Sequence, residues 1–236
     1  MKPDEMEYFG RVFKADIRRV RDMLVAIYDK KWAASHMEVP LYYMFRHLFR
    51  NEKDKALLKK LNVRYCITII PAIERGAELN RTFGHGHALA KPGMTYPEVY
   101  EILEGEAHFI FQRVEGKNAV DVILIKAKKG DRVVVPPNTE HFTTNHSKKD
   151  LKMADIAVEY KSDYEGVVNR QGAAYFELSD GKFVKNKNYG KIAKIRKLKP
   201  NNDIIPKDIY TMIIMPKMLA LLRDPEQTLK ALKMKK

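Results

Sequence analysis

The sequence predicts a mainly β protein built on an antiparallel barrel or jelly roll. Between residues 64 and 159, short stretches rich in β-branched and aromatic residues follow one another closely. Turn signals such as Glu104-Gly105 and Lys129-Gly130-Asp131 separate several of them. No helical pattern and no internal repeat interrupts the series. Many short strands without helices between them are typical of barrels and jelly rolls.

The elements can be placed from their periodicity. Residues 5–31 predict a helix, because apolar residues recur there at three- and four-residue spacing, and a shorter amphipathic helix is predicted over 54–61. Asp224-Pro225-Glu226 predicts a late helix start, with Asp as N-cap and Pro at the first position. Strands are predicted over residues 64–70, 78–82, 98–103, 107–113, 120–127, 132–135, 141–145 and 151–159.

These differences in predicted secondary structure and in composition divide the chain into three parts. Residues 1–62 are expected to form an N-terminal helical segment that packs on the barrel, and residues 63–181 the barrel itself. Residues 182–236 are expected to form a basic, partly helical C-terminal extension. A chain of 236 residues, 45% of them hydrophobic, is long enough for one well-cored domain with appendages or for two small domains.

Composition restricts the cellular setting. The single cysteine, Cys66, excludes an internal disulfide framework and fits a reducing compartment. The acidic N-terminal segment lacks the apolar stretch of a signal peptide, and no apolar run reaches the length of about 20 residues that a membrane span needs. We therefore expect a cytoplasmic protein with no membrane partner.

The positive charge is confined to one part of the chain. Residues 182–236 carry 15 Lys and Arg against 4 Asp and Glu, which is a net charge of +11 out of the total of +14. A basic tail can bind phosphate backbones, but no aromatic residues interleave with it as they do in nucleic-acid-binding folds. This favours a solvated lysine-rich surface over a nucleic-acid partner.

Two histidines one residue apart, His85 and His87, suggest a metal site. Side chains alternate along a strand, so both imidazoles would point to the same face. Glu98 and His141, from two further predicted strands, could complete a divalent-metal site that keeps positions open for a substrate. We interpret the other histidines as ordinary surface or core residues. They are His36, His47, His108 and His146.

Two blocks around these residues resemble the paired motifs of the cupin superfamily. The first contains Gly84, His85, His87, Glu98 and Gly105, and the second Gly130, Pro136, His141 and Asn145. Asn138 stands where the second motif usually has glycine, and the loop from His87 to Glu98 is longer than usual. The resemblance implies a cupin double-stranded β-helix.

The residues around both motifs are similar to those of the cupin-type glucose-6-phosphate isomerases of archaea and some bacteria. The main segments are Thr82-Phe83-Gly84-His85-Gly86-His87 and Tyr96-Pro97-Glu98-Val99-Tyr100, and the resemblance covers about residues 40–178. It implies a sugar-phosphate substrate and a homodimer. Where better-known archaeal members have a histidine between two tyrosines, this chain has Lys161-Ser162-Asp163.

The resemblance also implies the roles of particular residues. One divalent ion per chain (Fe²⁺, Mn²⁺, Ni²⁺ or Zn²⁺) would be held by three imidazoles and a carboxylate, and Glu98 and Tyr100 would be catalytic. The ligands would be His85, His87, Glu98 and His141. The substrate-binding residues would be Tyr42, Thr68, Thr82 and the Gly84 backbone at the phosphate, and Tyr100, Tyr160 and Tyr164 along the sugar.

The expected reaction interconverts glucose 6-phosphate and fructose 6-phosphate through a cis-enediol(ate), whose charge the metal stabilises as a Lewis acid. Glu98 is the candidate that carries the proton between C1 and C2, and a metal-assisted hydride shift is the open alternative. Three other functions compete. They are a mannose-6-phosphate isomerase, an iron-dependent dioxygenase on the same metal site, and a non-catalytic sugar-phosphate sensor.

Overall fold

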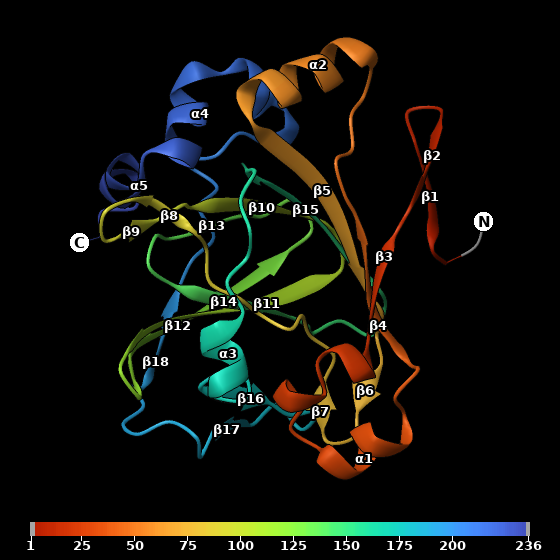
Figure 1. Ribbon diagram of the computed structural model, residues 1–236, viewed down its shortest axis with the longest axis vertical. Coiled ribbons are helices and arrows are strands. Elements are labelled where there is room, and N and C mark those ends of the chain that lie inside the picture. The colour runs from red at the N-terminus through yellow and green to blue at the C-terminus, as the bar shows by residue number, and fades with distance from the viewer. Residues whose placement is uncertain (1–2, 235–236) are drawn as a thin grey trace.

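Two β-sheets face each other in the computed structural model, which describes residues 3–234 (Figure 1). The larger sheet has the strand order β13-β10-β15-β5-β4-β3, and the smaller one β14-β11-β12-β18. The strands of the larger sheet are β3 (Asp16–Arg19), β4 (Pro40–Phe45), β5 (Val63–Ile70), β10 (Glu98–Glu104), β13 (Arg132–Val135) and β15 (Leu151–Val158). Those of the smaller sheet are β11 (Glu106–Glu115), β12 (Asn118–Lys128), β14 (Glu140–Asn145) and β18 (Ile195–Leu198).

This architecture confirms the predicted mainly β jelly roll. The paired strands run antiparallel, except that β18 lies parallel to β12. One predicted strand, over residues 78–82, is much shorter than expected. Only β7 (Glu78–Leu79) forms, paired with β6 (Glu74–Arg75). The chain leaves the strand because the Arg81 guanidinium is buried on Glu78 and on the carbonyl of Ala26.

The helix predicted over residues 5–31 is wrong. The segment instead forms β1 (Glu5–Tyr8), β2 (Arg11–Lys14), β3, two 3₁₀ turns η1 (Val20–Asp22) and η2 (Leu24–Ala26), and the start of α1 (Lys30–Ser35). Phe9 and Gly10 adopt positive φ angles of 48° and 72° and turn β1 back onto β2. Pairing between β3 and β4 gives this segment tertiary hydrogen bonds, which override its helical periodicity.

Both other predicted helices form where expected. Helix α2 (Glu52–Leu61) begins at Asn51, whose side chain accepts a hydrogen bond from the Asp54 amide. Helix α5 (Pro225–Ala231) begins at Asp224, whose side chain accepts from the Glu226 amide. The C-terminal part also contains η3 (Ile209–Ile214) and α4 (Pro216–Arg223).

The C-terminal elements cover the outer face of the larger sheet together with α2, at the top of Figure 1. Ile209, Ile213 and Leu222 are buried there against the outward-facing side chains of β5, β10 and β15. Residues 182–236 also supply β18 and β17 (Phe183–Lys185), the partner of β16 (Tyr175–Glu177). The extension therefore packs on the barrel, whereas the divisions at residues 62 and 181 remain predictions.

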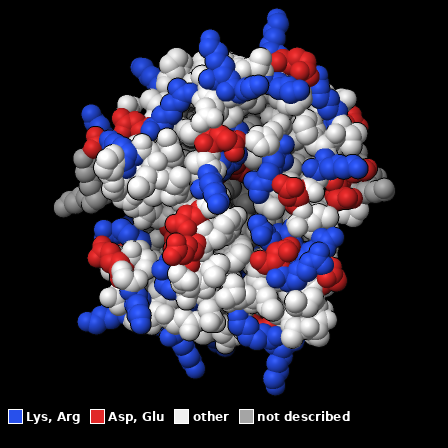
Figure 2. Space-filling model, viewed as in Figure 1, with Lys and Arg blue, Asp and Glu red and all other residues white. Residues whose placement is uncertain are grey.

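The other core lies between the two sheets and includes Phe109, Phe111, Val135 and Met153. The remaining elements are α3 (Glu165–Asn169) and a hairpin of β8 (Leu89–Lys91) and β9 (Met94–Thr95). On the face in Figure 2, Asp and Glu lie among the Lys and Arg side chains. Within residues 3–234, no helix is both long enough and apolar enough to cross a bilayer.

Candidate metal centre

Three histidines from two distant parts of the chain meet at one end of the space between the sheets. One ring nitrogen from each of His85, His87 and His141 lies within 4.8 Å of the other two. His85 and His87 do not belong to a regular strand. However, His85 and His141 exchange backbone hydrogen bonds of 3.3 and 3.0 Å, which places the His85 ring centroid 4.4 Å from that of His141.

Glu98, at the start of β10, completes the group. Its Oε2 atom lies 3.3 Å from Nε2 of His87 and 3.4 Å from Nε2 of His141. The structure therefore brings all four predicted metal ligands together. Glu98 reaches this position because its strand pairs with β13 on one side and with β15 on the other.

The donor set fits a divalent transition metal. Nδ1 of His87 lies 2.7 Å from the carbonyl oxygen of Tyr96, to which it can only donate, so Nε2 keeps its lone pair. That Nε2 atom is buried and has no hydrogen-bond partner among residues 3–234. Nδ1 of His85 is held in the same way, 3.0 Å from the Gly86 carbonyl. Such second contacts orient imidazoles for metal coordination.

Electrostatics keep these groups in their metal-binding form. Burial and the neighbouring His87 lower the pKa of His85 to about 4, and burial with the other two imidazoles lowers the pKa of His141 well below its usual range. Burial alone would raise the pKa of Glu98, but His87, Arg64 and His141 together hold it well below its usual range. At neutral pH, His85 and His141 are therefore neutral imidazoles and Glu98 is an ionised carboxylate.

Two buried side chains fix the Glu98 carboxylate. Nη2 of Arg64 lies 3.2 Å from Oε1, and the Tyr100 hydroxyl donates to Oε2 at 3.0 Å. The same hydroxyl lies 3.2 Å from Nε2 of His141. Burial and the charge of Glu98 raise the pKa of Tyr100 well above its usual range, so the hydroxyl keeps its proton.

The predicted substrate-binding residues surround a pocket that opens beside the imidazoles. Those that line it together with His85, Glu98 and His141 are Tyr42, Thr68, Thr82, Gly84, Tyr100 and Tyr164. Tyr160 does not line this pocket. Its ring lies 4.8 Å from the His87 ring and under the Arg64 guanidinium, so it supports two residues of the site from behind.

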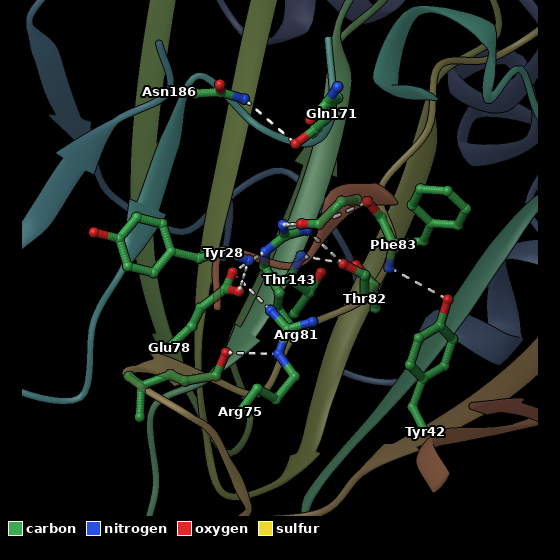
Figure 3. Close-up of polar contacts among 12 residues, drawn as sticks. Tyr28, Tyr42, Arg75, Glu78, Arg81, Thr82, Phe83, Thr143, Gln171 and Asn186 are labelled. Carbon is green, nitrogen blue, oxygen red and sulfur yellow. Dashed lines mark hydrogen bonds and ion pairs between the residues drawn. The ribbon is translucent and has the colours of Figure 1, made fainter. Parts of the chain in front are cut away.

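A buried ionic network holds the segment that leads into the histidines (Figure 3). The Glu78 carboxylate lies 2.6 Å from Arg75 and 2.7 Å from Arg81, and it also accepts from the Tyr28 amide. Further along, the Thr82 hydroxyl accepts from the Thr143 amide at 3.1 Å. The hydroxyl hydrogen of Thr82 therefore stays free to donate into the pocket.

Gly84 allows this segment to pass close to β14. Its φ angle is +81°, and a Cβ atom at this position would lie 2.0 Å from the side chain of Phe142. Nearby, Phe83 donates its backbone N–H to the Tyr42 hydroxyl at 3.3 Å, as Figure 3 shows. The backbone and Tyr42 thus define one wall of the pocket.

Asn138 fixes the long loop between His87 and Glu98. It takes a left-handed conformation with φ of 61°, as expected for an asparagine in place of glycine. Its side chain accepts from the Thr95 amide and donates to the Gly93 carbonyl, both at 2.9 Å. The loop forms the β8–β9 hairpin, tied to the second motif.

Sequence reasoning missed three charged residues of the pocket, Arg46, Arg64 and Asp155. Arg64 and Asp155 occur at positions where a strand otherwise presents buried apolar side chains. Arg64 lies four residues before Thr68 on β5, so the two side chains point to the same face of the strand, and Thr68 was already predicted to belong to the site. A charged residue on the inward face of a buried strand was the available signal.

The facing sheets and the buried cluster of three imidazoles and a carboxylate define a cupin with a candidate metal centre. A family model described as Glucose-6-phosphate isomerase (GPI) matches residues 17–194. Because the match spans most of the chain, the protein belongs to this family, in its cupin-type form. No curated protein matches the sequence.

Solved structures of similar fold include an oxalate oxidase, at 12% identity and a TM-score of 0.41, covering 55% of this chain and 58% of that one. Oxalate decarboxylase from Bacillus subtilis has 16% identity and a TM-score of 0.37, covering 51% of this chain and 27% of that one. Vicilin from Capsicum annuum has 12% identity and a TM-score of 0.38, covering 70% and 34%. The chain spans less than two thirds of each of these proteins.

Proposed function

We propose that this protein is a metal-dependent glucose-6-phosphate isomerase that interconverts glucose 6-phosphate and fructose 6-phosphate. The observation that carries the proposal is a single pocket where His85, His141, Glu98 and the hydroxyls expected at a sugar phosphate come together. The family match supports the same reaction. A cytoplasmic location and a homodimer remain predictions from the sequence.

His85, His87, Glu98 and His141 would hold the metal ion. When bound, a divalent metal supplies Lewis-acid stabilisation of the negative charge that develops on the sugar oxygens. Iron(II), manganese, nickel and zinc all accept such ligands. We propose one of these ions as the native metal.

The hydroxyls and arginines of the pocket would bind the substrate. Thr68, Thr82 and Tyr42 bring hydroxyl groups to the wall of the pocket that Gly84 also lines. Arg46 adds a positive charge to the pocket, although its Nε atom also donates a hydrogen bond to Oδ2 of Asp16 at 2.8 Å. Together they form a polar wall that suits a phosphate dianion, whereas Tyr100 and Tyr164 line the part nearer the imidazoles.

Glu98 is the proposed proton carrier. Its carboxylate is ionised at neutral pH and can accept the C2 proton of glucose 6-phosphate and return it to C1. Tyr100 and Arg64 orient the two carboxylate oxygens. Asp155 lies in the same pocket, and burial together with the charge of Glu98 raises its pKa to about 7. It is therefore largely neutral below pH 7, which keeps a second negative charge away from Glu98.

The decisive experiment is a coupled assay of fructose 6-phosphate to glucose 6-phosphate conversion, with chelator-treated protein and after each divalent ion is restored. We expect activity only with metal. His87→Ala and Glu98→Gln should each reduce kcat by about 100-fold or more in a folded protein. Glu104→Gln is the matched control, because Glu104 ends the same strand with an exposed side chain. Near-full activity of either site variant would disprove the assigned roles.

The same protein samples test the competing functions. Turnover of mannose 6-phosphate without turnover of glucose 6-phosphate would replace the proposal by the other isomerase. Oxygen consumption with a diketone or thiol substrate would replace it by a dioxygenase. Tight sugar-phosphate binding without any turnover, in protein loaded with each metal in turn, would indicate a sensor.

A further inference from the structure

A second cluster of metal-binding side chains lies away from the pocket. His108 on β11, His146 just after β14 and Glu177 on β16 each place one possible ligand atom within 4.8 Å of the others. Both Nδ1 atoms approach the same carboxylate oxygen, Oε1 of Glu177, at 2.6 Å from His108 and 3.2 Å from His146. The two imidazole rings are stacked, with centroids 3.8 Å apart.

This cluster occupies the opposite face of the smaller sheet from the candidate metal centre. Phe111 pairs with His141, and three residues earlier on the same strand His108 pairs with Thr144. Because side chains alternate along a strand, His108 and His141 point to opposite faces. The outer face that carries His108 is covered by the β16–β17 hairpin, drawn below the barrel in Figure 1.

Among residues 3–234, Glu177 has no Lys or Arg counter-ion. Its side chain is only 2% exposed, and the ion pairs it forms within residues 3–234 are those with the two histidines. Lys126 lies opposite His108 on β12, but it makes no ion pair with Glu177 among these residues. A buried carboxylate without Lys or Arg is costly unless another cation compensates it.

Oε2 of Glu177 is buried and has no hydrogen-bond partner among the described residues. Two imidazoles and one carboxylate are a common ligand set for zinc. Neighbouring first-row divalent ions such as cobalt also bind such nitrogen and oxygen ligands. The His146 side chain is 35% exposed, so an ion could enter from solvent and keep a water ligand.

We propose that His108, His146 and Glu177 form a second binding site, for an exchangeable divalent transition-metal ion of the zinc or cobalt type. The bound ion neutralises Glu177 and links β16 to β11 and to the residue after β14. Because the three ligands come from separate parts of the chain, binding would stabilise the fold on this side of the barrel. The site is independent of the proposed isomerase reaction.

The test counts bound ions and does not depend on activity. Protein freed of metal by a chelator is incubated with Zn²⁺ or Co²⁺, separated from free ion by gel filtration and analysed for metal. We expect two ions per chain for the wild type. His146→Ala, which alters a partly exposed side chain, and the near-isosteric Glu177→Gln should each lose one of them. His36→Ala, an exposed histidine outside both clusters, is the matched control and should keep two.

A second measurement distinguishes the loss of a metal ligand from the loss of folded protein. In a His87→Ala background, which lacks the first site, Zn²⁺ should still raise the melting temperature, and adding His146→Ala should remove that rise. The proposal is overturned if His146→Ala and Glu177→Gln bind as many ions as the wild type. It is equally overturned if His87→Ala alone leaves no bound ion.

Discussion

Gly84 shows how a single residue controls the shape of the pocket. Two separate constraints apply to it, namely a left-handed φ angle and contact with Phe142. Gly93 shares the first constraint, with φ of +75°, but a Cβ atom there would meet nothing within 4 Å. A comparison of substitutions at Gly84 and Gly93 therefore separates the cost of backbone strain from the cost of steric overlap.

We expect Gly84→Ala to lower the free energy of unfolding by about 2–4 kcal/mol, because strain and overpacking add. Gly93→Ala should lower it by only about 1–2 kcal/mol. Denaturant unfolding of both variants measures the difference. Equal losses would mean that Phe142 moves away without cost.

The pKa of His85, lowered to about 4, predicts how metal-free protein responds to acid. An unfolded chain has an imidazole of pKa near 6.5, so between about pH 6.5 and 4 it binds a proton that the folded chain does not. The stability due to neutral His85 is complete above pH 6.5 and is lost as the pH falls toward 4.

His85→Asn should therefore make metal-free protein less sensitive to acid. Between pH 7.5 and pH 5 we expect the variant to lose about 1–2 kcal/mol less stability than the wild type. Melting or denaturant curves at both pH values measure this. If both proteins lost the same amount, the His85 imidazole would be protonated as readily in the folded state as in the unfolded state.

At the scale of elements, β11 and β14 organise both the candidate metal centre and the proposed second site. They pair antiparallel over Ala107 to Gln112, and the alternation of their side chains sends one set of residues toward the interior and the other toward the β16–β17 hairpin. The C-terminal elements have a comparable role on the larger sheet, where they bury apolar side chains that would otherwise face water.

Leu222, fully buried in α4, tests whether the C-terminal extension is an integral part of the fold. Leu222→Ala should lower the free energy of unfolding by about 2–4 kcal/mol in one cooperative transition. Ile214→Ala, at a side chain that is 69% exposed, should change it by less than about 0.5 kcal/mol. A separate early transition would mean that the extension unfolds independently of the barrel.

At the scale of the whole molecule, strand β5 and the strands from β10 to β15 could be placed from the sequence, because their alternation and turns are local properties. The four ligands of the candidate metal centre could also be named, since two motifs with recognisable spacing contain them. The N-terminal segment could not be assigned in this way. Its helical spacing is real, but pairing of β3 with β4 determines its structure.

The sequence by itself determined most of the strand pattern, the helix over residues 54–61, the helix start at Asp224, and the residue types of the candidate metal centre. Only the tertiary structure decided that Arg64 and Asp155 join the pocket, and that His108, His146 and Glu177 lie together. The reason is physical. Spacing along the chain specifies which face of a strand a side chain occupies, whereas contacts between distant segments depend on how both sheets and their covering hairpins pack.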